Sequence, residues 1–374
     1  MLLIETQSGG IMSLNKAILR CLLICLALVA APDSGKSQVP ASPQVRPAID
    51  GIMAAFRSHP LVGMGDYHGV AQEEDFYAAI IRDPRFAQDV GNVVVEFGEA
   101  SSQPIIDRYV NGEDVPYAEL RKVWSNPVGW IPTVTAQGLI NVFAVIRDVN
   151  LALPPGQRVH VWLGDPPVDW SKVNAQADAR PVLAQRDSYP AGIIEKEILG
   201  KGKKSLVIYG TFHYYGDDSL WGIISKAHPG TFFRVTPYAG FVENSCSATM
   251  EEQFSAWPLP ALVMPVRGTT LEAQFHRADC HFIAPGSMRF PPSVSQQEAA
   301  SRIADLEDQS SGVAGEALLY LGPASSLTLS PLSPDIYLDT EYRAEIARHV
   351  AVRGLPPMKS SVASNPATPR RLRP

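Results

Sequence analysis

The sequence has few cysteines, few charged residues and no basic cluster in its body. Of its 374 residues, four are cysteine and 19% are charged, whereas 45% are hydrophobic. This composition excludes a disordered or fibrous chain and is typical of a globular protein with a substantial core. The net charge is -6, and only the tail Arg370–Arg373 is basic. We therefore expect no nucleic-acid partner, because phosphate binding needs clustered Lys and Arg.

The N-terminus also lacks an apolar run long enough to span a bilayer comfortably. The apolar segment Cys21–Ala31 (CLLICLALVAA) follows Lys16 and Arg20 and precedes a Pro/Ser/Gly-rich stretch over 32–47. This order is typical of a secretory signal peptide, with a retained N-terminal anchor as the alternative. We predict a signal peptide and lead-in over residues 1–37, and a secreted or periplasmic protein with no stable membrane span after processing.

Removal of the signal peptide would leave two of the four cysteines. Cys21 and Cys25 would leave with the signal, so that Cys246 and Cys280 remain. Two cysteines in an oxidising compartment predict one disulfide. Two separate buried thiols are the alternative.

The interior contains no long low-complexity linker, so we expect one domain over residues 48–350 and a flexible basic tail over 351–374. Short β-branched or aromatic runs alternate with helical patterns. This alternation predicts an α/β fold with a largely parallel central sheet flanked by helices. The expected strands are 61–64, 93–97, 159–163, 206–209, 232–235 and 262–266, and the expected helices include 73–81, 133–150 and 189–199.

Polar residues stand where four of these strands end. His68 follows the first run, Glu96 ends the second, Asp165 ends the third and His213 follows the fourth. Each residue alone is typical of an ordinary loop or turn. A carboxylate among valines, as at Glu96, is costly to bury without a partner. Because ligand sites in such sheets lie at the carboxyl ends of the strands, we expect these side chains to meet there.

Two kinds of chemistry suit these residues. His68 could take a proton from water while a carboxylate orients its ring, and Asp66 shares a face with it if the segment stays extended. Alternatively, His68, Glu96 and His213 could bind a divalent metal with an open water position. Both arrangements would activate water. The sequence contains no G-x-S-x-G, H-E-x-x-H or Walker-type phosphate loop, which disfavours a serine hydrolase or a nucleotide enzyme.

Two G-x-x-H motifs, GDYH (Gly65–His68) and GTFH (Gly210–His213), with a glutamate ending an intervening strand, resemble the erythromycin esterase/ChaN-like superfamily. The resemblance extends over EFGEASSQPIIDRYVNGED, VWLGDPP and RDSYPAGIIEKEI, which begin at Glu96, Val161 and Arg186. The C-terminal stretch ALLYLGPASSLTLSPLSPDIYLD is similar to exported, uncharacterised members of the erythromycin esterase branch.

The resemblance implies an α/β fold and, in the esterase branch, a histidine-activated water that opens a macrolide lactone. His68 would then be the general base, with Asp66 where that branch usually has glutamate, and with Glu96 and His213 completing the pocket. Arg186 would bind a substrate oxyanion or carboxylate. We also predict that Asp165, Glu99 and Tyr67 contact the substrate.

The sequence therefore predicts an exported hydrolase of an ester or a related bond in a small molecule. The alternative from another class is a haem- or metal-binding protein of the ChaN-like type without turnover, in which Tyr67, Tyr214 and Tyr215 would suit haem iron. The sequence does not identify a cofactor, and a divalent metal fits it better than haem.

Overall fold

The computed structural model describes residues 42–129, 136–238, 245–275, 315–354 and 370–371, and all of these belong to one unit. The predicted signal peptide, most of the predicted tail and the predicted disulfide partner Cys280 lie outside the described residues. No helix in the described ranges is both long and apolar enough to cross a membrane.

The centre of the fold is an eight-stranded sheet in the order β1-β7-β8-β6-β2-β5-β3-β4. Neighbouring strands are parallel except where β7 pairs antiparallel with β1 and β8. The prediction of an α/β fold with a largely parallel sheet is therefore confirmed. The strands are β1 (Gln44–Pro47), β2 (Leu61–Asp66), β3 (Asn92–Glu99), β4 (His160–Asp165), β5 (Ser205–Gly210), β6 (Phe232–Pro237), β7 (Ala261–Met264) and β8 (Ala317–Tyr320).

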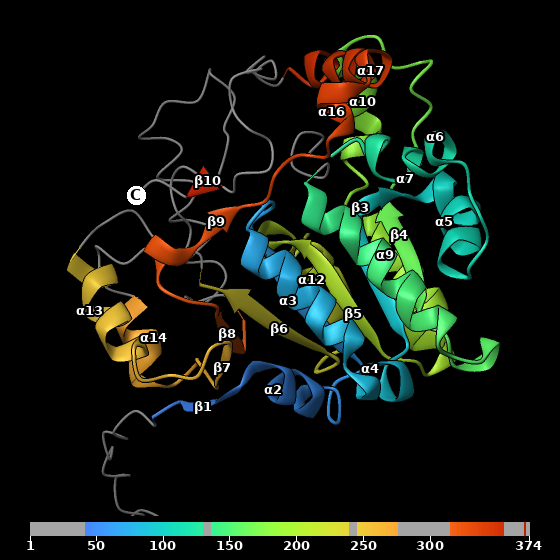
Figure 1. Cartoon of the computed structure of the whole chain (residues 1–374). Coiled ribbons are helices and arrows are strands. Elements are labelled where there is room, and N and C mark those ends of the chain that lie inside the picture. The colour runs from blue at the N-terminus through green and yellow to red at the C-terminus, as the bar shows by residue number, and fades with distance from the viewer. Residues whose placement is uncertain (1–41, 130–135, 239–244, 276–314, 355–369, 372–374) are drawn as a thin grey trace, which may run out of the picture. The chain divides into compact units, whose positions relative to one another are not determined.

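Helices cover both faces of this sheet (Figure 1). The largest apolar core lies on one face and includes side chains from α2 (Ala48–Ala55), α3 (Ala71–Arg82), α4 (Pro84–Asp89), α5 (Gln103–Val110), α7 (Lys122–Ser125) and α9 (Gln137–Leu151). A second core packs α11 (Ser188–Ile193), the π-helical turn Ile194–Ile198 and α12 (Leu220–Ala227) against the strands. A third packs α13 (Ser245–Phe254) and α14 (Thr270–Phe275) against β7 and β8.

A smaller apolar cluster joins α10 (Gln176–Leu183), α16 (Asp335–Leu338) and α17 (Thr340–Val352). Two short strands, β9 (Thr328–Leu329) and β10 (Arg370–Arg371), pair with each other outside the main sheet. The short helix α6 (Tyr117–Leu120) completes the α-helices of the described residues.

Helix α3 shows how local sequence sets the element that flanks the site. Its inner face buries Phe76, Tyr77 and Ile80 against the sheet, as the spacing of apolar residues predicts. The helix ends before Asp83, whose side chain accepts a hydrogen bond from the Arg85 backbone N–H at 3.0 Å and begins α4. Two further buried residues of α3 are acidic, and this departs from an ordinary amphipathic pattern.

The expected strands all occur, but the sheet is larger than expected. The additional strands β1 and β8 flank β7, and the reversal of β7 makes the sheet mixed at this edge. Among the described residues, β1 lies before the predicted domain start at 48, and α17 continues to Val352, beyond the predicted end at 350. The helix expected from 133 begins at Gln137 among the described residues.

Candidate active site

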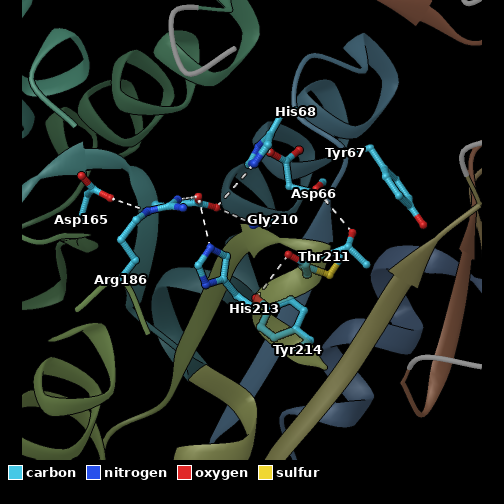
Figure 2. Close-up of polar contacts among 12 residues, drawn as sticks. Asp66, Tyr67, His68, Asp165, Arg186, Gly210, Thr211, His213 and Tyr214 are labelled. Carbon is cyan, nitrogen blue, oxygen red and sulfur yellow. Dashed lines mark hydrogen bonds and ion pairs between the residues drawn. The ribbon is translucent and has the colours of Figure 1, made fainter. Parts of the chain in front are cut away.

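The four strand ends singled out in the sequence lie next to one another, because β2, β5, β3 and β4 are consecutive in the sheet. Their carboxyl ends bring His68, Glu96, Asp165 and His213 into one network of polar contacts with Arg186 (Figure 2). The predicted convergence of these side chains is therefore present in the structure.

Asp66 and His68 form the first half of this network. Asp66 is the last residue of β2 and is buried, and its Oδ2 lies 2.5 Å from His68 Nδ1. The segment does not stay extended as expected, because His68 has a φ of 47° in the left-handed region. A non-glycine residue rarely adopts this conformation, and such strain is often found at functional sites. The turn directs the imidazole back over the strand end and towards Glu96.

Glu96 lies at the centre of the network. Its Oε2 accepts a hydrogen bond from the Gly210 backbone N–H at 2.6 Å and lies 3.7 Å from His68 Nε2. Its Oε1 lies 3.4 Å from His213 Nε2 and accepts a hydrogen bond from Arg186 Nη2. A Cβ at position 210 would come within 2.8 Å of His68 Nε2, so the close approach of these groups requires glycine there. Buried Glu96 thus has hydrogen-bond and cationic partners, which offset the cost of burying a carboxylate in an apolar run.

The second half of the network mirrors the first. His213 lies in a short 3₁₀ turn after β5, and its Nδ1 is 2.7 Å from Asp187 Oδ1. The same oxygen accepts a hydrogen bond from the Leu220 backbone N–H at the start of α12, at 2.7 Å. Asp187 was not predicted as a site residue, although it directly follows Arg186 in the sequence. That adjacency is the signal that could have identified it.

Arg186 joins the two carboxylates on the β3 and β4 side of the site. Its Nε lies 3.2 Å from Asp165 Oδ1, and the other oxygen of Asp165 accepts a hydrogen bond from the Val128 backbone N–H at 2.6 Å. Burial raises the pKa of Asp165 to about 6, and Arg186 opposes this rise. The guanidinium therefore already has two carboxylate partners, so any role in binding substrate would be shared with its role in holding Glu96.

The charges in this network set distinct pKa values for its members. Burial alone would raise the pKa of Glu96, but His213, Arg186 and His68 hold it well below its usual range. Burial lowers the pKa of His213, yet Glu96 and Asp187 more than compensate and raise it to about 9. For His68, Asp66 and Glu96 likewise outweigh burial and raise the pKa. Glu96 is therefore an anion and His213 a cation at neutral pH.

Two of the predicted substrate contacts have structural roles in the described chain. Glu99 is fully buried and caps a 3₁₀ turn, accepting hydrogen bonds from the Ser101 backbone N–H at 2.8 Å and the Ser101 hydroxyl at 2.5 Å. The backbone N–H of Tyr67 donates to Glu73 Oε2 at 3.0 Å, which fixes the loop before His68. Tyr67 lies beside the site in Figure 2.

The donor set does not fit a metal centre in the arrangement described. No group of three or more His, Cys, Asp or Glu side chains within the described ranges is placed to hold a metal ion. The physical reason is that the Arg186 guanidinium already neutralises Glu96, and a cation would have to displace it. The predicted ligand set of His68, Glu96 and His213 is thus close together but organised around an ion pair.

Comparison with known proteins gives weak similarities only. No family model and no curated protein matches the chain. A solved structure of a Bacillus cereus protein matches with a TM-score of 0.47 and 10% identity, over 76% of this chain and 95% of that one. A succinoglycan biosynthesis protein matches with a TM-score of 0.41 and 9% identity, over 62% of this chain and 76% of that one. ChaN of Campylobacter jejuni, whose structure describes cofacial haem binding, matches with a TM-score of 0.35 and 12% identity, over 55% and 94%. At these values the assignment of an α/β fold depends on the strands and helices of this chain itself.

Proposed function

We propose that this protein is an exported hydrolase in which a histidine activates water for attack on an ester or a related bond of a small molecule. The observation that supports the proposal is the chain of side chains Asp66, His68, Glu96, His213 and Asp187, in which an Asp–His pair lies on each side of one glutamate. One histidine is suited to accept a proton, and the other is suited to carry a positive charge.

Asp66 determines which nitrogen of His68 acts as the base. Because Nδ1 of the neutral ring donates to Asp66, the lone pair is on Nε2. When Nε2 takes a proton from water, the water oxygen adds to the ester carbonyl carbon, and the carbonyl electron pair moves to its oxygen. The imidazolium is stabilised by Asp66 and Glu96. The electron pair on the carbonyl oxygen then re-forms the carbonyl, the bond between the carbonyl carbon and the alkoxide oxygen breaks, and the imidazolium gives its proton to the alkoxide oxygen. The products are a carboxylic acid and an alcohol.

His213 and Arg186 supply the positive charge that this reaction needs. With a pKa of about 9, His213 is an imidazolium at neutral pH. Negative charge develops on the carbonyl oxygen as water attacks, and positive charges already fixed in the site stabilise it without reorganisation. In this proposal Glu96 keeps both cations in place, and Asp187 holds the ring of His213.

The alternative, haem or metal binding without turnover, has less support from the contacts. Of the tyrosines considered for haem iron, Tyr214 is buried, and its hydroxyl donates to the Val207 carbonyl oxygen at 2.8 Å. That hydroxyl is therefore engaged inside the fold. The Arg186–Glu96 ion pair opposes metal binding, as described above.

The experiment that separates these functions measures ester turnover and haem binding on the same purified protein. Aryl esters of increasing acyl length and a macrolide lactone serve as substrates, with and without EDTA, and haem is titrated while the Soret band is recorded. We expect turnover that EDTA does not reduce. A Soret shift at one equivalent of haem with no turnover on any substrate would instead establish the binding function.

A further inference from the structure

A second set of buried polar groups lies behind the Asp66–His68 pair. Glu73, Glu74 and Tyr77 on α3 are each at most 1% exposed, although two of them carry carboxyl groups. Burying an ionised carboxylate without a cation is costly, and Asp66 is a further carboxylate beside them. Within the described residues, the groups with the largest effect on the pKa of Glu73 are Asp66, Glu74, the Tyr77 hydroxyl and the Tyr67 backbone N–H, and none of these is a cation.

The Tyr77 hydroxyl connects this set to Asp66. Its oxygen lies 3.0 Å from the Gly65 carbonyl oxygen, 3.2 Å from Asp66 Oδ1 and 3.4 Å from Glu73 Oε2. A phenol has one proton to donate and can accept through its lone pairs. Gly65 O and an ionised Asp66 can only accept. The single proton of Tyr77 goes to one of these two acceptors, so Tyr77 can form a hydrogen bond with Glu73 Oε2 only by accepting, which requires Glu73 to carry a proton.

The protonation of Glu73 agrees with its surroundings. Burial raises the pKa of Glu73 well above its usual range, and the charge of Asp66 raises it further. A neutral Glu73 can still accept the hydrogen bond from the Tyr67 backbone N–H at 3.0 Å. The carboxyl group thus ties the residue before His68 to the phenol that faces Asp66. This linkage holds the N-terminal side of the turn in which His68 has its unusual φ.

We propose that Tyr77 and a neutral Glu73 act as positioning residues that orient Asp66 and the loop of His68, so that the imidazole is held as a base. This inference rests on the proposed function, and it adds residues that do not touch the substrate. The network runs from Glu73 through Tyr77 to Asp66, whose two oxygens accept from the Tyr77 hydroxyl and from His68 Nδ1.

The test uses Tyr77→Phe, Glu73→Ala and Glu73→Gln in the full chain with ¹⁵N-labelled histidine. The chemical shift of the His68 Nδ1 proton reports the hydrogen bond to Asp66 whether or not a substrate is turned over. Tyr77→Phe is expected to shift this resonance and to lower kcat about tenfold with KM unchanged, as expected for loss of one hydrogen bond to a charged group. In Glu73→Gln the amide NH₂ at the Oε2 position can donate to Tyr77 but cannot accept from the Tyr67 backbone N–H, so this variant is expected to recover the part of the Glu73→Ala loss that Tyr77 carries.

Tyr342→Phe is the matched control, because Tyr342 is fully buried and its hydroxyl makes no hydrogen bond within the described residues. It should leave the His68 resonance in place. The inference is overturned if Tyr77→Phe also leaves the resonance in place, or if Glu73→Gln loses as much as Glu73→Ala. An absence of ester turnover in the wild-type protein would reject the proposed function, whereas the NMR result would still decide the positioning role.

Discussion

The two Asp–His pairs of this site have the same composition and different surroundings. His68 follows β2 in a turn with positive φ, its side chain is 14% exposed, and its Nε2 is 3.7 Å from Glu96. His213 lies in a 3₁₀ turn after β5, its side chain is 9% exposed, and its Nε2 is 3.4 Å from Glu96. Both rings face the same carboxylate from opposite sides.

The comparison shows how one residue type can take two roles in one site. The pKa of His213 is raised to about 9 by Glu96 and Asp187 against the effect of burial, so His213 keeps its proton under neutral conditions. His68 is the more exposed ring and is farther from Glu96, and we expect it to release its proton first. Histidines with separated pKa values can divide the functions of base and cation between them.

The largest expected effect is that of removing the base. His68→Ala should lower kcat on a hydrolysed ester by a factor on the order of 10² to 10⁴ and leave KM nearly unchanged, because general-base catalysis acts on the transition state. Steady-state kinetics at pH 7.5 measure this. His228→Ala is the control, since His228 is partly exposed and pairs with Glu195 away from the network. Wild-type turnover in His68→Ala would show that the base is elsewhere.

Removal of the His213 cation should have the next largest effect on kcat. His213→Gln keeps a polar side chain of similar length but removes the positive charge, and kcat should fall on the order of 10², because a fixed charge that stabilises the oxyanion is lost. The variant should also lose the alkaline decline of activity. A His213→Gln enzyme that keeps both wild-type kcat and the alkaline limb would remove this residue from the mechanism.

The pH profile distinguishes the two pairs directly. The rate should rise with pH as His68 becomes neutral, through a pKa above the ordinary 6.5, and should fall near pH 9 as His213 loses its proton. Asp187→Asn removes a group that stabilises the His213 cation, so the alkaline limb should move to lower pH while the acidic limb stays. A shift of both limbs together would indicate that the pairs do not act separately.

The remaining effect concerns stability rather than catalysis. The folded-state pKa of His213 is raised, so its contribution is fully present below the ordinary value of 6.5 and is lost as pH rises through about 9. One pKa unit corresponds to about 1.4 kcal/mol, so the free energy of unfolding should fall by roughly 3 kcal/mol over this range. Urea unfolding of wild type and His213→Gln at both ends of the range measures it, and equal losses in the two proteins would contradict it.

Much of the sheet could be predicted from sequence because its strands are short and apolar and stop at Gly, Asp or Pro. Runs such as Val93–Phe97 carry this information locally. The pairing of β1 and β8 with β7 could not be predicted in this way, because Gln44–Pro47 and Ala317–Tyr320 become strands only by pairing with a partner distant in the sequence. The pattern of residues within a segment does not specify which strand will pair with it.

Part of the site could also be predicted, because the ends of these apolar strands can be recognised in the local sequence. His68, Glu96 and His213 stand at strand ends, where topology brings them together. Asp187 and Tyr77 lie in or beside helices, and their approach to the site depends on how these helices pack. In the sequence, an acidic helix start such as 73–75 is typical of a solvated surface, and only the packing of α3 shows that Glu73 and Glu74 are buried.

The most direct test of this account is a titration of both site histidines in one ¹⁵N-histidine-labelled sample, with resonances assigned from the His68 and His213 variants. We predict that His68 loses its proton first and that His213 remains an imidazolium until about pH 9. The acidic limb of kcat/KM for ester hydrolysis should follow the His68 titration. If His213 titrates before His68, or if the acidic limb follows another group, the division of roles between the two pairs is wrong.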